Sequence, residues 1–164
     1  MKRNVTILSI IAAFFLFNAS SCNDTGDEGF TQIKVIETQI YNEIDSYRLN
    51  NGISANDPFV HQPLMVKEAQ MFSAEMAFGT GEVDTTGLAI HWDNIHDKIG
   101  GYNDATLLLT TTASSAAGIV SAWTSDSASS AILLEDYTQC GAGVVTVEDS
   151  ISYVTVMMMY VESK

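Results

Sequence analysis

The sequence predicts a domain of the α+β class, with helices first and strands at the end of the chain. Apolar residues recur at helical spacing in three segments, which begin near residues 31, 63 and 116. Two β-branched and apolar runs close the chain, at residues 144–147 and 151–161. A chain of 164 residues that is 46% apolar can bury one sizeable core. These observations together predict helices that cover a small antiparallel sheet.

The first helix is expected to run from about Thr31 to Asn51. Thr31 is a candidate N-cap, and Gly52 is a candidate residue just beyond the C-terminus. Its apolar positions are separated by three, four, four and three residues, which places them on one helical stripe: Ile33, Ile36, Ile40, Ile44 and Tyr47.

The same spacing of apolar residues predicts two further helices. Pro63 suits the first turn of the second helix, and Gly79 and Gly81 are expected to end it. The third helix carries a stripe from Ala116 to Trp123, with Thr112 or Ser114 as its cap. Between these helices the pattern is weaker. It indicates a short element that ends at residues 98–101, and either a short buried strand or a turn at residues 107–109.

The two final apolar runs predict a β-hairpin whose turn is Glu148-Asp149-Ser150. The second run is apolar on both of its alternating faces. A strand that is buried on both faces belongs inside a layered structure.

The N-terminus has the pattern of an export signal. Lys2 and Arg3 precede an uncharged apolar run from Val5 to Phe17, which is too short to span a bilayer as a stable helix. Small residues then lead to Cys22, an order that resembles a bacterial lipobox. We therefore expect a signal peptide at residues 1–21, lipid attachment at Cys22, an acidic tether at residues 22–30 and a domain at residues 31–164. The alternative is an ordinary signal peptide with an unrelated Cys near its cleavage site.

These features predict a protein attached to the membrane by an N-terminal lipid, in the bacterial envelope, at the outer membrane or the cell surface. Acidic residues that follow a lipidated Cys can route a protein to the surface, although a plain spacer explains them as well. Seven Lys and Arg against twenty Asp and Glu give a net charge of −13, which excludes nucleic acid as a partner. Cys140 has no partner for an internal disulfide and is expected to be a core residue.

Several segments resemble the CAP superfamily, the relatives of cysteine-rich secretory proteins, antigen 5 and plant pathogenesis-related proteins. They occur in the family's order, from about Gln32 to the end of the chain: residues 40–48, residues 64–77, Ala122-Trp123 with Ser125 and Ile132-Leu133, and Gly141-Ala142-Gly143-Val144. The resemblance implies a three-layer α-β-α sandwich that ends in the C-terminal hairpin.

The resemblance also implies a cavity that, in the family, is often lined by two His and two acidic residues and can hold a divalent metal. His91 matches the first His and Asp126 one acidic position, whereas the Glu-Asn pair falls on Leu107-Leu108. The second His falls near Ala128-Ser129, and no His follows His96 anywhere in the chain. A further His of bacterial members falls on Phe72.

We therefore expect a degenerate cavity marked by His91, Asp126, Leu107 and Ala128, with no metal and no cofactor. His91 and Asp126 supply at most two ligands, fewer than a lasting zinc site needs. The run from His91 to Asp97 offers a second set of two His and two Asp. Its spacing fits no helical or zinc-finger pattern, so we interpret it as a polar loop whose His residues are hydrogen-bonded.

Three functions remain open. The first is a non-catalytic binding or structural module of the envelope, expected to be a monomer with an unknown envelope ligand. The second is an envelope hydrolase that uses His91 with Asp126 or Asp93 as acid and base. The third is a binder of small apolar ligands, with Met65, Phe72 and the run Met157–Met159 lining its pocket.

Overall fold

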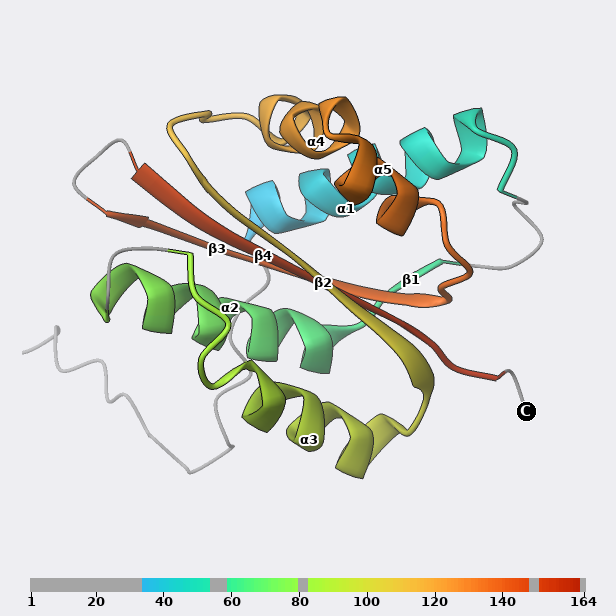
Figure 1. Ribbon diagram of the computed structural model, residues 1–164, viewed down its shortest axis with the longest axis horizontal. Coiled ribbons are helices and arrows are strands. Elements are labelled where there is room, and N and C mark those ends of the chain that lie inside the picture. Colours follow the sequence, from blue (N-terminus) through green and yellow to red (C-terminus); the bar gives the residue numbers. More distant parts are fainter. Residues whose placement is uncertain (1–33, 54–58, 80–82, 148–150, 163–164) are drawn as a thin grey trace, which may run out of the picture.

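A four-stranded sheet lies between two layers of helices in the computed structural model, which describes residues 34–53, 59–79, 83–147 and 151–162 (Figure 1). The helices on one face are α1 (Val35–Asn50), α4 (Ala116–Ser125) and α5 (Ser127–Leu133). Those on the opposite face are α2 (Pro63–Phe78) and α3 (Leu88–Ile99). The predicted α+β class and the three layers are thus confirmed.

The sheet has the strand order β1-β3-β4-β2. Its strands are β1 (Val60–His61), β2 (Tyr102–Thr111), β3 (Gln139–Val147) and β4 (Ile151–Tyr160). The predicted hairpin is present, since β3 and β4 are antiparallel neighbours. The two-residue β1 pairs with β3 in parallel, so the sheet is mixed and not purely antiparallel as expected.

The strand β4 is buried on both faces, as its sequence predicts. Val154 and Met158 pack with α1 and α4, whereas Met157 and Met159 pack with α2 and α3. This alternation divides the interior into two cores, one on each side of the sheet.

The helix α1 begins at Val35, with Lys34 as its N-cap, and Gly52 follows its C-terminus with φ of 89°. Thr31, the predicted cap, lies outside the described residues. Arg48 is buried on this helix, and its guanidinium donates hydrogen bonds to the carbonyls of Leu133, Glu135 and Tyr137. Those three bonds attach α1 to the segment that joins α5 and β3.

The helix α2 starts at Pro63, as predicted, and lies with its backbone directly against β3. Two glycines of β3 permit this contact. A Cβ atom at Gly141 would lie 2.3 Å from the carbonyl carbon of Met65, and one at Gly143 would lie 2.2 Å from the backbone of Ala69.

Two local predictions were wrong, and one open choice is decided by the structure. Residues 91–97, interpreted as a polar loop, lie within α3. Only His91 and Ile95 are buried on that helix, so its sequence has a narrow apolar stripe. Of the buried strand and the turn considered at residues 107–109, the strand is present, but it is the ten-residue β2, in which only Leu107 is buried. The predicted caps of α4, Thr112 and Ser114, are not its N-cap. The N-cap is Ser115, whose side chain accepts a hydrogen bond from the backbone N–H of Gly118.

No helix in the described part of the chain is both long and apolar enough to cross a membrane. Cys140 is fully buried in the core beneath α1, and burial raises the pKa of its thiol to about 12. The thiol therefore has the character of a small core residue, as predicted.

Candidate functional site

His91 is held between two carboxylates of α2. Its Nδ1 lies 2.8 Å from an oxygen of Glu68, and its Nε2 lies 3.3 Å from an oxygen of Glu75. The ring and Glu68 are almost wholly buried, whereas 54% of the Glu75 side chain is exposed. The two ring nitrogens of His91 therefore each face a carboxylate oxygen, one buried and one half exposed.

A phenyl ring and a side-chain amide also lie near His91 and its carboxylate partners. The ring of Phe72 meets the imidazole edge-on, with the ring centroids 5.4 Å apart. The side-chain amide of Asn94 donates to Glu68 over 3.4 Å. Phe72, the position where the resemblance implies a further His of bacterial members, therefore packs against His91.

Asp126 does not approach His91. It lies at the N-cap of α5, on the opposite side of the sheet, and its carboxylate accepts from the backbone N–H of Ser129 over 2.8 Å (Figure 1). That hydrogen bond holds the pKa of Asp126 below its ordinary value. The sheet separates the two groups, so His91 and Asp126 cannot act as one acid–base pair.

The other positions implied by the resemblance are also dispersed. Leu107 is buried on the α1 side of the sheet, whereas Leu108 packs on the α2 side. Ala128 is exposed on α5. The structure therefore does not bring His91, Asp126, Leu107 and Ala128 together around one cavity.

Asp93 is exposed on α3, two residues beyond His91, and on a helix that spacing directs it to another face. His96 also points elsewhere, with its Nε2 2.7 Å from Asp104 on β2. Within the described residues, no group of three or more His, Cys, Asp or Glu side chains is placed to hold a metal ion.

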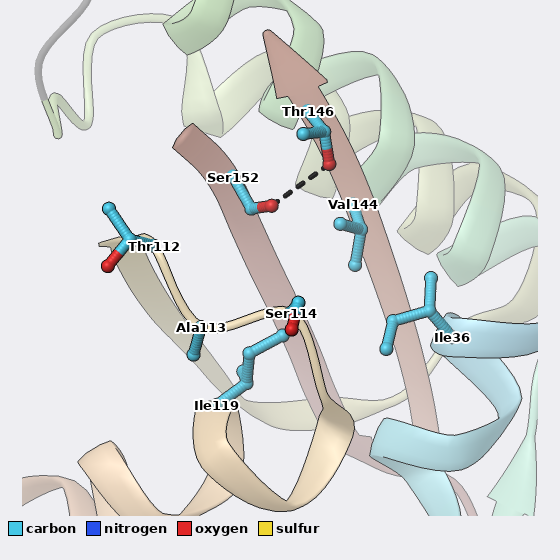
Figure 2. A pocket seen from close by; sticks show the side chains of 8 residues that line it. All are labelled: Ile36, Thr112, Ala113, Ser114, Ile119, Val144, Thr146 and Ser152. Atoms are coloured by element: carbon cyan, nitrogen blue, oxygen red, sulfur yellow. Dashed lines mark hydrogen bonds between the residues drawn. The ribbon is translucent and has the colours of Figure 1, made fainter. Parts of the chain in front are cut away.

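A pocket of about 240 Å³ opens on the α1 side of the sheet, between the start of α1, the loop before α4 and the ends of β3 and β4 (Figure 2). Its described lining is aliphatic or hydroxylic: Ile36, Thr112, Ala113, Ser114, Ile119, Val144, Thr146 and Ser152. The hydroxyls of Thr146 and Ser152 are hydrogen-bonded to each other over 2.9 Å. No described imidazole, carboxylate or thiol lines this pocket, so its hydroxyls have no adjacent base.

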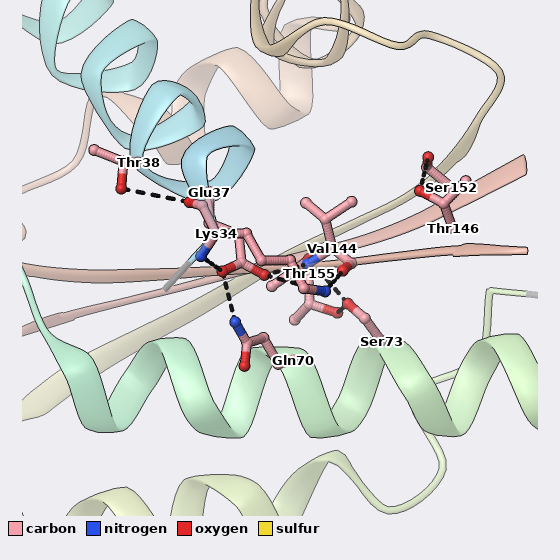
Figure 3. A network of polar contacts seen from close by, with 10 residues as sticks. Lys34, Glu37, Thr38, Gln70, Ser73, Val144, Thr146, Ser152 and Thr155 are labelled. Carbon is pink, nitrogen blue, oxygen red and sulfur yellow. Dashed lines mark hydrogen bonds and ion pairs between the residues drawn. The ribbon is translucent and has the colours of Figure 1, made fainter. Parts of the chain in front are cut away.

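A buried polar network lies beside this pocket, at the edge of β3 that β1 is too short to cover (Figure 3). Fully buried Glu37 accepts from the backbone N–H of Val144 over 3.0 Å and from the amide of Gln70 over 2.5 Å. Lys34 donates to the carbonyl of Val144. The network therefore provides hydrogen-bond partners for a part of β3 that β1 does not pair with, and it joins α1 to α2, which is a structural role.

The Met and Phe side chains proposed for an apolar pocket are core residues. Met65, Met157 and Met159 pack together under α2, and Met158 packs on the other side of the sheet. Of this set only Phe72 lines a described pocket, a small one at the end of α2. The positions therefore do not form one apolar binding cavity in the described structure.

The sequence interpretation missed both partners of His91. Glu68 and Glu75 are seven residues apart, two helical turns, so both lie on the α2 face that meets α3. This spacing on a predicted helix is a sequence signal for two carboxylates on one face. It indicates a partner only when residues 88–99 are also recognised as a helix.

The arrangement of elements is similar to that of solved structures. An outer surface protein of Borrelia burgdorferi matches with a TM-score of 0.58 and 16% identity over 75% of this chain and 90% of that one. Venom allergen-like protein 4 of Schistosoma mansoni matches with a TM-score of 0.56 and 11% identity over 80% of this chain and 92% of that one. No family model matches the sequence, and no curated protein matches it significantly. The structural likeness shows that the chain has a CAP-like fold.

Proposed function

We propose that this protein is a lipid-anchored module of the cell envelope that binds a partner or supports structure and does not catalyse a reaction. The observation that carries the proposal is the separation of the chemical groups. The hydroxyls of the larger pocket lie on one side of the sheet, and the imidazole of His91 lies on the other. A hydrolytic site of the nucleophile-and-base type needs both within hydrogen-bond reach.

The environment of His91 also favours a binding or structural role. Its Nδ1 is taken by Glu68, its Nε2 faces Glu75, and Phe72 packs against its edge. These contacts join α2 to α3 and leave the ring 3% exposed. A general base must reach its substrate, and this imidazole is enclosed by its own helices.

The anchor rests on the sequence. The apolar run of residues 5–17 followed by Cys22 has the order of an export signal with a lipidated Cys. The similarity to a protein described as an outer surface protein supports a location at the cell surface. Replacement of Cys22 by Ser is expected to release the protein from the membrane fraction, and retention of the variant there would contradict the anchor.

Hydrolysis assays test the absence of catalysis. Residues 22–164 with Cys22→Ser are incubated with dye-labelled casein and dye-labelled peptidoglycan, beside the same protein with His91→Gln and, as a matched control, His96→Gln. We expect no product from any of the three proteins. Product that forms with the parent and the His96 variant, but not with the His91 variant, would overturn the proposal.

A further inference from the structure

A second pocket, of about 180 Å³, lies between the end of α2 and the described residues just before α3, on the side of the sheet that these helices cover (Figure 1). Its described lining residues are Phe72, Glu75, Met76, Gly79, Asp84 and Thr86. We propose that this pocket binds the side chain of a Lys or Arg residue presented by a partner peptide. The proposal rests on the proposed function as a binding module, and it names the chemistry of the partner.

The lining combines apolar side chains with carboxylates. Phe72 and Met76 are 1% and 3% exposed, so they belong to the interior. Glu75 is half exposed, and Asp84 stands in the loop that leads to α3. A Lys or Arg side chain has the matching form, because its alkyl stem packs on apolar surface while its charged head reaches a carboxylate.

The size of the pocket selects a single side chain. Sites for drug-sized ligands occupy about 300 to 1,000 Å³, which is larger than this pocket of about 180 Å³. Glu75 and Asp84 already contact His91 and Thr86, and a neutral apolar side chain would add no ion pair to either carboxylate.

The surface around the pocket exposes large apolar side chains. Phe78 precedes the lining residue Gly79 and is 75% exposed, and Val83 precedes Asp84 and is 49% exposed. Ile90, beside His91 on α3, is 64% exposed. Phe78 and Val83 adjoin lining residues in the chain, and exposed apolar side chains of this kind are available to contact the residues that flank the cation.

Charge favours the same partner. The chain carries a net charge of −13, so its field attracts basic segments and repels acidic ones. The imidazole of His91 lies 3.3 Å from one oxygen of Glu75, whose side chain is 54% exposed. The outer side of Glu75 thus remains open to a positive group from outside.

A titration followed by ¹H–¹⁵N NMR tests the proposal on residues 22–164 with Cys22→Ser. The probes are capped tripeptides Leu-Arg-Leu and Leu-Lys-Leu, with Leu-citrulline-Leu and Leu-norleucine-Leu as neutral matches, and spermidine as a free amine. We expect saturable shifts in residues 72–79 and 84–91 with the two basic peptides, weaker at high salt because the contact is half exposed.

Variants locate the contact. Glu75→Gln and Asp84→Asn are each expected to weaken binding of Leu-Arg-Leu by about two- to fivefold, the range of one exposed ion pair. The matched control Glu43→Gln removes an exposed acid of α1, on the opposite layer, and should leave binding unchanged. Phe78→Ser, at a side chain too exposed to affect folding, should weaken the peptides but not spermidine.

Four results would overturn the proposal. The first is that the citrulline peptide binds as tightly as Leu-Arg-Leu, and the second is that the Glu75 and Glu43 variants bind Leu-Arg-Leu with equal affinity. The third is that no saturable shift appears up to about 10 mM peptide, since binding weaker than this is not specific recognition. Spermidine that binds more tightly than either basic peptide would assign the pocket to a free amine and also overturn it. Catalysis is measured separately, so failure here leaves the hydrolysis test of the proposed function unaffected.

Discussion

Replacement of Gly143 by Ala is expected to destabilise the domain severely, because β3 and α2 touch through their backbones at this position. A Cβ atom there would lie 2.2 Å from the carbonyl carbon of Ala69 and 2.2 Å from the backbone nitrogen of Gln70, where ordinary contacts begin at 3.4 Å. Backbone cannot rotate aside as a flexible side chain can. The whole helix would have to move away from the sheet by about 1 Å or more.

Such a movement loosens the core beneath α2. The helix buries Met65, Phe72 and Met76 against β3 and β4, so a rigid displacement weakens all of those contacts together. Overpacking of a core costs about 1 to 3 kcal/mol and occasionally more. We expect a loss at the upper end, about 3 kcal/mol, because both contacting atoms belong to the main chain.

Urea unfolding measures this loss, with the fluorescence of Trp92 and Trp123 and the far-ultraviolet circular dichroism as probes. A loss of about 3 kcal/mol corresponds to a midpoint lowered by about 1.5 M for a domain of this size. The matched control is Gly52→Ala, where φ is 89° but no atom lies within 4 Å of the added Cβ. That change introduces backbone strain alone, about 1 kcal/mol. Equal losses in the two variants would refute the backbone contact as the cause.

Three further changes test the buried polar groups. Arg48→Met leaves three carbonyls without the hydrogen bonds that the guanidinium donates. It should lower the free energy of unfolding in urea by about 3 kcal/mol. The carboxylate of Glu37 accepts hydrogen bonds from the backbone N–H of Val144 and the amide of Gln70. Glu37→Gln places an NH₂ donor against one of these donors, and it should lower the free energy of unfolding by about 2 kcal/mol in the same assay. For Cys140 the folded pKa of about 12 lies above the ordinary value of 9.0, so its contribution to stability is complete below pH 9 and is lost as the pH rises toward 12. The parent should therefore lose more stability between about pH 9 and 11 than Cys140→Ala, by about 1 to 3 kcal/mol.

Each of these expectations has a contrary outcome. Arg48→Met that unfolds at the parental urea concentration would mean that water replaces the guanidinium at those carbonyls. Glu43→Gln is the exposed control for the Glu37 change, and it should alter the free energy of unfolding by less than about 0.5 kcal/mol. Equal effects of the two changes would mean that the hydrogen bonds of Glu37 do not stabilise the domain. Parallel alkaline profiles of the parent and the Cys140 variant would show that the thiol does not contribute.

The candidate site illustrates where reasoning from sequence stops. His91 could be singled out because the resemblance places a functional His there. Its partners could not, because Glu68 and Glu75 come from another helix and meet it only after α3 packs on α2. The acid that sequence order proposed, Asp126, caps α5 on the far side of the sheet. Position along the chain carries no information about which face of a sheet a helix will cover.

The sequence by itself determined the local elements that have a strong period or a fixed backbone preference. The stripe of α1, the proline at the start of α2 and the doubly apolar run of β4 are such signals, because spacing and covalent geometry act within a few residues. Only the tertiary structure decided the parallel pairing of β1, the extent of β2 and the contacts of His91. These depend on contacts between residues far apart in the chain, and their free energy appears only once the two helical layers close over the sheet.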